Sequence, residues 1–364
     1  MRFAIKHITL KILRLPLTIL SQALAVCMFL SYISIYISPA DAWIFAYFGL
    51  MFQPLFLLNL LMLVFLMILR RKIFLLQLAT FLPGIFFLGD FFRLSGNSES
   101  DKLDGSLKVI TYNVQMFNLP FRKSDTSYLN ILSFIKVENP DILCLQEFYT
   151  AEGKLTEEEF AAALPELPYR AVFYNIRKNN SLYGIATFSK YPIKINLEIP
   201  FENSSNSAMY SDIEVGDKII RVYNVHFQSV RLNLQRSLRR IIGGHDELRA
   251  AELEEVSTRL KTAFVKRARQ VDEVAKHISV SPYPVIVCGD FNDTPVSYTY
   301  HVIKGNKKDA FCEQGRGLPS TFRDLFPSFR IDYILHDRNM EALSYKIPQV
   351  DYSDHYPVVS RIDY

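Results

Sequence analysis

The stretch Pro284-Val285-Ile286-Val287-Cys288-Gly289-Asp290-Phe291-Asn292-Asp293 decides the fold of the larger part of this chain. Its four apolar residues run into Gly289, and a carboxylate and a carboxamide follow two positions apart. The run is too short for a helix and predicts a buried strand that stops and turns outward. Asp290 and Asn292 would then project from a strand end over a pocket. For this stretch alone, an Asp/Asn turn that merely closes the strand is the better interpretation.

Other strand-like runs also carry polar side chains at or near their ends. These runs cover residues 107–113, 141–147, 219–226 and 330–335, and a polar pair precedes the final strand. The complete set of polar residues is Asn113, Glu147, His226, Asp290, Asn292, Asp332, Asp354 and His355. Carboxylates and carboxamides without thiolates suit a hard cation such as Mg²⁺ or Mn²⁺. Two histidines beside such a cation can neutralise, position or protonate a phosphate.

Helical patterns alternate with these strands. Residues 124–137 predict a helix that stops before Pro140, residues 246–278 a long amphipathic helix, and residues 295–304 a shorter one. Mixed strands and helices over the last two thirds of the chain fit one large α/β domain. The sequence contains neither a P-loop nor a serine nucleophile elbow, which argues against a nucleotide-driven motor and an acyl hydrolase.

The net charge of +4 belongs to the N-terminal end of the chain. Residues 1–92 carry seven basic and two acidic residues, which leaves 34 basic and 35 acidic residues for 93–364. The pI of 8.7 is therefore not the signature of a nucleic-acid-binding domain. Residues 231–240 contain four arginines and no acid, and they fit either contact with phosphates or lipid headgroups or a solvated loop face.

The four cysteines have neither metal-ligand spacing nor a dense disulfide pattern. Cys27 lies in an apolar run, and Cys312 lies apart from the predicted strands. Cys144 and Cys288 stand inside predicted strands, where cysteine packs as a small hydrophobe. We expect both to fill the core, with a disulfide as the alternative if the domain faces an oxidising compartment.

Three apolar runs without charge occupy the first quarter of the chain, at residues 15–40, 42–69 and 73–89. About 20 apolar residues span a bilayer, so the third run must continue to about residue 92 to cross. The sequence predicts a membrane anchor over 1–92 with helices at 15–40, 42–69 and 73–92. We expect kinks at Gln53-Pro54 and Pro83-Gly84.

The charge-free runs contain no carboxylate or basic residue that would suggest transport. Their polar residues Gln22, Gln53, Asn59 and Gln77 are uncharged, and we expect them to join helices together. An anchor is therefore preferred to a transporter. Residues 93–105 are polar and rich in Gly and Ser, which predicts a short flexible linker between the anchor and a catalytic domain at 106–364.

Basic residues flank the first run at 2–14 and separate the second run from the third at 70–72. Because positive residues stay inside, three spans place the domain outside the cytoplasm. We predict a multi-pass protein of the plasma (inner) membrane with an extracytoplasmic catalytic domain. If the third run is only interfacial, the orientation reverses.

Six short motifs then appear in a fixed order: TYNV (111–114), LQE (145–147), NVHFQ (224–228), GDFND (289–293), RIDYIL (330–335) and SDHYP (353–357). Each is weak alone, but together they resemble the endonuclease/exonuclease/phosphatase superfamily over residues 106–364. The resemblance implies a sandwich of two β-sheets flanked by helices on both outer faces, preceded here by the helical membrane segment.

The resemblance also implies a metal site. Glu147 would be the principal ligand of Mg²⁺ or Mn²⁺, with Asn113 close by and Asp354 completing the metal and phosphate environment. Some relatives have a carboxylate two residues after the first asparagine, where this chain has Gln115. That difference leaves the number of metal ions open.

For catalysis, the resemblance implies that Asp290 orients or deprotonates the attacking water. Asn292 would bind the scissile phosphate and help to order Asp290. His226 and His355 would hydrogen-bond phosphate oxygens, and Asp332 would fix the tautomer of His355.

The function implied is a membrane-anchored, metal-dependent phosphoesterase acting on a phosphodiester or phosphomonoester. Its substrate would be a lipid headgroup, a nucleic acid or a small phosphodiester. It would also contact the lipid bilayer through residues 1–92. No protein partner is predicted. One alternative is an extracytoplasmic endonuclease for DNA or RNA, which the near-neutral domain charge disfavours mildly. Another is an inactive phosphate- or lipid-binding module, which the complete residue set disfavours.

Overall fold

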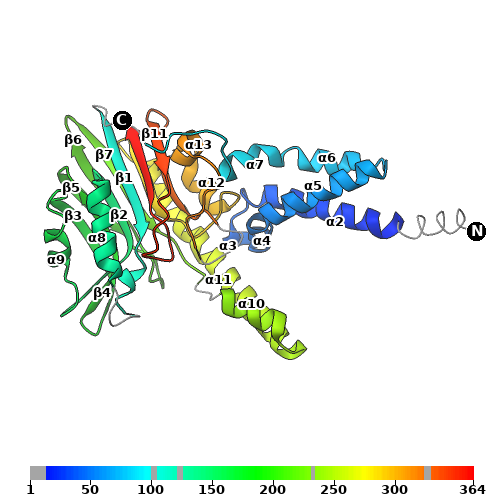
Figure 1. The fold of residues 1–364 in the computed structure, drawn as a ribbon, viewed down its shortest axis with the longest axis horizontal. Helices are drawn as coiled ribbons and strands as arrows, with labels where there is room; N and C mark the ends of the chain where they lie inside the picture. The colour runs from blue at the N-terminus through cyan, green and yellow to red at the C-terminus, as the bar shows by residue number, and fades with distance from the viewer. Residues whose placement is uncertain (1–13, 100–104, 121–125, 231–233, 324–328) are drawn as a thin grey trace, which may run out of the picture.

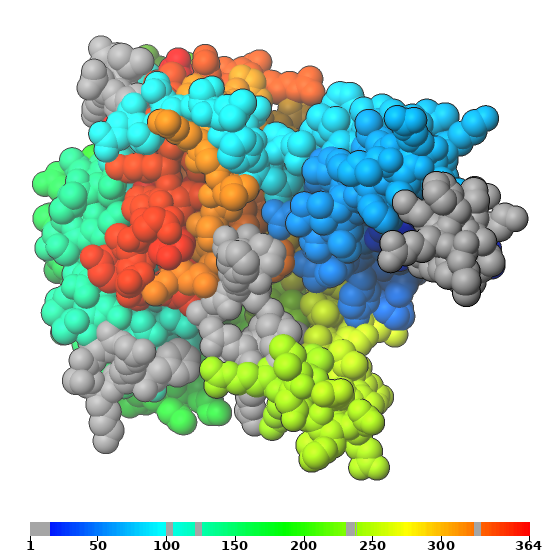
Figure 2. Space-filling model, turned by 45° about the vertical axis from the view of Figure 1, so that its right-hand side comes forward, coloured from blue at the N-terminus to red at the C-terminus, as the bar shows by residue number. Residues whose placement is uncertain are grey.

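The computed structural model describes residues 14–99, 105–120, 126–230, 234–323 and 329–364. A bundle of apolar helices extends from one side of a larger body built on two β-sheets (Figure 1). In the space-filling view these helices, coloured blue to cyan, pack directly against segments of the body coloured orange and yellow-green (Figure 2). The molecule therefore has an elongated helical part seated on a sheet-based part.

Two six-stranded sheets form the body. The first has the order β11 (Glu341–Lys346), β12 (Val358–Asp363), β1 (Ser106–Asn113), β2 (Ile142–Ala151), β4 (Ser181–Ser189) and β3 (Tyr169–Lys178). The second has the order β5 (Ile193–Ile199), β6 (Ala208–Val215), β7 (Lys218–His226), β8 (Val285–Asp290), β10 (Asp332–His336) and β9 (Lys308–Asp309). Only β1–β2 and β7–β8 are parallel among these paired strands. Their carboxyl ends therefore meet at one edge of the sandwich.

Apolar layers hold the sheets to each other and to the helices outside them. The outer helical segments are η1 (Gln115–Asn118), α8 (Ser127–Glu138), α9 (Glu157–Ala162), α10 (Leu234–Gly243), α11 (Asp246–Ser279), α12 (Tyr298–Lys304) and α13 (Ala310–Gln314). Ile131 of α8 and Phe160 of α9 pack on the first sheet, and Val271 of α11 and Tyr300 of α12 on the second. The expected two-sheet sandwich with flanking helices is confirmed.

The space between the sheets is filled mainly by aliphatic side chains and the two buried cysteines. Val109 and Cys144 of the first sheet lie in the same cluster as Val222 and Cys288 of the second. Both thiols are free and buried, as expected for cysteines that pack as small hydrophobes.

Residue 289, directly before Asp290, must be glycine because of its backbone conformation and its close approach to β7. Its φ is +145°, and a Cβ atom there would lie 1.9 Å from the carbonyl oxygen of Val225 on β7. Only glycine allows this close approach of β8 to β7. The substitution of any other residue would displace the strand end that carries Asp290.

The apolar part consists of α2 (Arg14–Ile33), α3 (Pro39–Ala42), α4 (Ile44–Leu50), α5 (Phe52–Ile68), α6 (Phe74–Phe81) and α7 (Gly84–Phe91). Within the described residues, α2 alone is long and apolar enough to cross a membrane as a straight helix. The number rises to three if α4–α5 and α6–α7, bent by 66° and 45°, each count as one span.

These boundaries correct the expected spans. The first helix ends at Ile33 instead of residue 40, because the chain turns there toward Pro39. The second run breaks between Leu50 and Phe52, not at Gln53-Pro54. Pro54 sits in the first turn of α5, where its missing N–H breaks no hydrogen bond. The third run bends at Pro83-Gly84 as expected.

Polar side chains in the apolar part meet in its interior. Gln77 donates to Asn59 and accepts from the Ser21 hydroxyl at 2.9 Å, which ties α6 to α5 and α2. Asn59 and Gln77 therefore join helices as expected. Gln22 does not, because it lies on the exposed face of α2.

Residues 93–97, expected to belong to a flexible linker, lie against the body. Arg93 forms an antiparallel bridge with Gly317, and the Tyr345 amide donates to the Asn97 carbonyl at 2.7 Å. Residues 100–104 lie outside the described part of the chain.

Candidate active site

Strand register brings the predicted residues together at one edge of the sandwich. Asp290 is the partner of His226 on the parallel strand β7 and of Asp332 on the antiparallel strand β10. Asn113, at the end of β1 in the other sheet, donates from Nδ2 to Asp290 Oδ2 at 3.0 Å. The buried carboxylate of Asp290 is thus contacted by site residues of both sheets.

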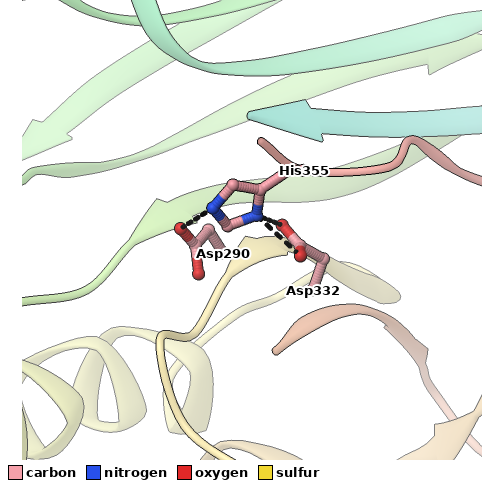
Figure 3. A group of neighbouring side chains, drawn as sticks. All are labelled: Asp290, Asp332 and His355. Atoms are coloured by element: carbon pink, nitrogen blue, oxygen red, sulfur yellow. Dashed lines mark hydrogen bonds and ion pairs between the residues drawn. The ribbon is translucent and has the colours of Figure 1, made fainter. Parts of the chain in front are cut away.

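His355 lies between two carboxylates (Figure 3). Its Nδ1 is 3.0 Å from Asp332 Oδ2, and its Nε2 is 3.8 Å from Asp290 Oδ2. Burial by itself lowers the pKa of His355, but Asp332 and Asp290 outweigh it and raise that pKa well above the usual value. The two carboxylates therefore favour the protonated ring, which donates from both Nδ1 and Nε2.

A second pair of contacts fixes the loop that carries His355. The Ser353 hydroxyl donates to the Asn113 carbonyl at 2.7 Å and accepts from the His355 amide at 3.2 Å. Ser353 was not among the predicted site residues, although it belongs to the SDHYP motif.

Asn292 orders Asp290 directly. Its backbone amide donates to Asp290 Oδ1 at 2.8 Å, and its Nδ2 donates to Asp290 Oδ2 and to the Phe227 carbonyl, each at 3.0 Å. Asn292 has a φ of +53°, a left-handed conformation that asparagine tolerates better than most residues. Burial raises the pKa of Asp290, while His355 and His226 oppose the rise.

Glu147 stands at an irregularity in β2, between Gln146 and Phe148, with a φ of +54°. This bulge turns the side chain out of the strand, and 21% of it remains exposed. Burial raises the pKa of Glu147 to about 7, with a further contribution from Asp354. Its Oε1 is 3.9 Å from His226 Nε2.

The donor chemistry around Glu147 fits a hard divalent cation. Glu147, Asp354 and Asn113 each carry side-chain oxygen that could serve as a ligand, and repulsion from Asp354 helps to raise the pKa of Glu147. Gln115 accepts through Oε1 from the Asp354 amide at 3.3 Å, so it holds the loop that carries Asp354.

A second set of possible ligands, within the described part of the chain, is Asp290, Asp332 and His355, whose ligand atoms lie within 4.8 Å of one another. Here both ring nitrogens of His355 already face carboxylates. A hydrogen bond to Asp332 and an ion pair with Asp290 account for this group without an ion. The more exposed Glu147 is the better candidate for a metal ligand.

Glu147 also forms one wall of a pocket of about 640 Å³. The pocket extends from Glu147 along the ends of β3 and β4, and Tyr149, Ile176 and Leu182 give it a largely apolar lining. Lys178 is its basic residue. Apart from Glu147, the sequence motifs gave no signal for this pocket, because its other lining residues lie outside them.

A buried polar bridge beneath the site also escaped the sequence analysis. Gln146 Nε2 donates to Asn224 Oδ1 at 2.7 Å and to Thr111 Oγ1 at 3.0 Å, which connects the two sheets. Thr111 and Asn224 stand two positions before Asn113 and His226, so each shares a strand face with a site residue. That spacing is the signal that could have identified them.

Comparison with known proteins supports this arrangement. Residues 110–355, more than half of the chain, match the model of the Endonuclease/Exonuclease/phosphatase family. Residues 11–91 match the model of a domain of unknown function (DUF8431). The two matched regions correspond to the sheet-based and helical parts of the structure.

Several curated proteins share 25% identity with this chain. They include an exodeoxyribonuclease of Bacillus subtilis, similar over 62% of this chain and 79% of its own length, and a phospholipase C of Staphylococcus aureus, similar over 52% and 62%. Recombination repair protein 1 of Drosophila melanogaster is similar over 61% of this chain. The chain spans only 29% of that protein and less than two thirds of the phospholipase C.

Solved structures show the same fold. The endonuclease/exonuclease/phosphatase from Bacteroides vulgatus has 19% identity and a TM-score of 0.50, covering 71% of this chain and 98% of its own. The human Nocturnin catalytic domain with bound sulfate anion has 18% identity and a TM-score of 0.50, covering 72% and 96%. The chain belongs to the endonuclease/exonuclease/phosphatase family, whose members are hydrolases of phosphoester bonds and generally use divalent metals.

Proposed function

We propose that this chain is a membrane-anchored, divalent-metal-dependent phosphoesterase that cleaves a phosphodiester or phosphomonoester by attack of an activated water. The observation that carries the proposal is the convergence on Asp290. Its carboxylate accepts hydrogen bonds from Asn113 and Asn292 and lies within 4 Å of the Nε2 atoms of His226 and His355. A buried base, two imidazoles and a nearby glutamate are the groups that phosphoester hydrolysis needs.

Each residue of the site has its own role in the proposed reaction. Asp290, with a pKa raised by burial, orients the attacking water and accepts its proton. His355, kept charged by Asp332, donates from Nε2 to a phosphate oxygen whose negative charge increases in the transition state. His226 donates to the same phosphate. Asn292 orders Asp290, and it would contact phosphate only after releasing one of its two present acceptors.

Glu147, Asn113 and Asp354 would hold Mg²⁺ or Mn²⁺. When bound, such a cation offsets the charge of the phosphate oxygens and stabilises the leaving oxygen.

The pocket beside Glu147 supports a substrate that joins a phosphate to an apolar or aromatic group. Its lining is mainly apolar, and Lys178 supplies one positive charge. A polynucleotide groove would instead present several cations, because affinity for nucleic acid rests on neutralising successive phosphates. The near-neutral charge of residues 93–364 points the same way. The likeness to an exodeoxyribonuclease keeps a nuclease as the second candidate.

We further propose that the helical part crosses the membrane more than once and places the catalytic domain outside the cytoplasm. Its outward surface is apolar, as shown by Phe86, which is 88% exposed, and Ile68, which is 73% exposed. Its interior holds polar contacts, which suits helices surrounded by hydrocarbon. The basic residues at 70–72 support the orientation.

An activity panel tests the proposal. The full chain in detergent micelles or nanodiscs is incubated with bis-p-nitrophenyl phosphate, phosphocholine lipids, phosphoinositides, plasmid DNA and RNA, each with Mg²⁺, Mn²⁺ or excess chelator. We expect metal-dependent cleavage of a small or lipid phosphoester, and its loss in Asp290→Asn. Cleavage of DNA or RNA alone would establish the second candidate, and no cleavage of any substrate by the folded protein would contradict the proposal.

A further inference from the structure

The helical part contacts the body at two places that lie close in sequence to catalytic residues. One contact is made by Val296, in the loop that follows Asn292. The other is made by Arg330, two positions before Asp332. The helices meet the body along one side of it (Figure 1 and Figure 2).

The first contact joins α4 to the loop that follows Asp290 and Asn292. Val296 is fully buried and packs in one cluster with Met28 and Phe52 of the helical part. At Gly49 of α4, an added Cβ atom would lie 2.5 Å from the Val296 carbonyl oxygen. This close backbone approach leaves no room for a side chain, so the position of α4 limits the position of the loop.

The second contact joins α7 to the start of β10. Arg330, with 1% of its side chain exposed, donates from Nη2 to the Asp90 carbonyl at 3.0 Å and forms an ion pair with Asp309 at 2.6 Å. The Asp90 carbonyl lies in the last turn of α7, where helix carbonyls lack partners within the helix. Two residues after Arg330 comes Asp332, which holds Nδ1 of His355.

One hydroxyl connects the two contacts. The Tyr333 hydroxyl lies 2.8 Å from both the Arg330 carbonyl and the Asp293 carbonyl, so its single hydrogen is shared between these two acceptors. Asp293 in turn accepts from the buried Arg267 at 2.8 Å. The loop after Asp290 and the strand that begins at Asp332 are therefore fixed to each other as well as to the helices.

We propose that docking of α4 and α7 on the body positions the catalytic residues, with Val296 and Arg330 as the positioning residues. This inference rests on the proposed phosphoesterase function. In this arrangement the helical part supports the geometry of Asp290 and of the Asp332–His355 pair in addition to anchoring the chain. Because small displacements of reacting groups reduce rate steeply, loosening either contact should lower kcat and leave KM nearly unchanged.

A pair of glycine variants in the full chain tests the first contact. Gly49→Ala places a methyl group 2.5 Å from both the Val296 carbonyl oxygen and the Ser34 hydroxyl oxygen, whereas Gly84→Ala places one 2.7 Å from Phe56, entirely within the helical part. Both should lower thermal stability. We expect Gly49→Ala to reduce kcat per folded molecule by about 10- to 100-fold, while Gly84→Ala keeps it within about twofold of wild type. Equal kcat values for the two variants would overturn the inference.

A pair of arginine variants tests the second contact. Arg221 forms a bidentate ion pair with Asp212 at 2.6 and 2.8 Å. These residues lie on β7 and β6 of the sheet-based part. Arg330→Met and Arg221→Met should both destabilise the protein, because each leaves a carboxylate without its partner. Only Arg330→Met should lower kcat, with partial recovery in Arg330→Lys. A similar fall of kcat in both would contradict the positioning role.

Amide hydrogen exchange separates this inference from the proposed function. We expect faster exchange at residues 290–297 in Gly49→Ala than in Gly84→Ala, whatever the substrate. Wild-type protein that is inactive in the whole panel would contradict the function alone. Unchanged exchange at 290–297 in Gly49→Ala would contradict the inference alone.

Discussion

The helical part and the sheet-based part of this molecule distribute polar and apolar side chains between surface and interior in opposite ways. In the sandwich, aliphatic and aromatic side chains fill the interior, and the catalytic polar groups gather where strands end. In the helical part, large apolar side chains such as Phe86 face outward, while Ser21, Asn59 and Gln77 are buried together. Water is the expected surrounding of the first part and hydrocarbon that of the second.

The difference shows how the same residue types take on different roles. A buried glutamine in the sandwich, Gln146, bridges two sheets beneath the active site, and a buried glutamine in the helical part, Gln77, bridges helices. An outward leucine costs little on a water-facing helix and is favourable in a bilayer. Substitutions matched between the two parts therefore test the comparison.

The largest expected effect belongs to the polar edge of the sandwich. Asp290→Asn removes the proposed base and keeps the shape of the side chain, but one accepting oxygen becomes an NH₂ group that faces the donors of Asn113 or Asn292. We expect turnover per folded molecule to fall by about 10²- to 10⁴-fold, together with some loss of thermal stability. Steady-state kinetics with a chromogenic phosphodiester provide the measurement, and wild-type turnover in the variant would remove Asp290 from the mechanism.

The pairing of His355 with Asp332 should produce the next largest effect. His355→Ala should reduce turnover by about 100-fold or more, and Asp332→Ala by less, since Asp332 acts only through the ring. The double variant should be little worse than His355→Ala alone, because residues that act as a unit are not additive. Turnover per folded molecule across the four proteins tests this, and full additivity would contradict the pairing.

Outward leucines on two helices offer a matched pair. Leu61 of α5 is 58% exposed and Leu129 of α8 is 50% exposed. If α5 lies in the bilayer, Leu61→Lys should cost about 2.5–3.5 kcal/mol of insertion free energy, whereas Leu129→Lys should change stability by less than about 0.5 kcal/mol. Carbonate extraction of membranes and thermal unfolding measure the two quantities. Full membrane integration of Leu61→Lys would break the comparison.

The smallest effects come from the two buried glutamines. Gln146→Leu removes the donor to Asn224 Oδ1 and the hydrogen bonds to the Thr111 hydroxyl in a buried core, and it should cost about 1–3 kcal/mol. Gln77→Leu should cost about 0.6–1 kcal/mol, because polar contacts between membrane helices contribute modestly. The free energy of unfolding of each variant is measured in the same detergent and compared with that of wild type. A larger loss for Gln77→Leu than for Gln146→Leu would contradict the expected order.

Much of the sandwich was predictable because its strands are short apolar runs that end in polar residues. The motif around Asp290 located β8, and the other strand ends located Asn113, His226 and Asp332. The bulge at Glu147 and the left-handed backbone of Asn292 were not predictable, because each depends on the register of a neighbouring strand and on local hydrogen bonds.

The helical part was harder to predict for a different reason. Uniformly apolar sequence contains no periodic signal that marks where a helix breaks, so the bend at Met51 was missed. Pro83 did mark its bend correctly. The docking of the helices on Val296 and Arg330 was also missed, since contacts between distant segments leave no local pattern in a single sequence.

Metal binding by two variants tests the central claim most directly. Mn²⁺ affinity, measured by electron paramagnetic resonance, is compared for wild type, Glu147→Gln and Asp332→Asn, with turnover recorded in parallel. We predict that Glu147→Gln loses both Mn²⁺ binding and turnover, and that Asp332→Asn keeps Mn²⁺ binding while its turnover falls. Excess chelator should abolish activity, and Mg²⁺ or Mn²⁺ should restore it. Wild-type Mn²⁺ affinity in Glu147→Gln, or undiminished turnover in chelator, would contradict the account.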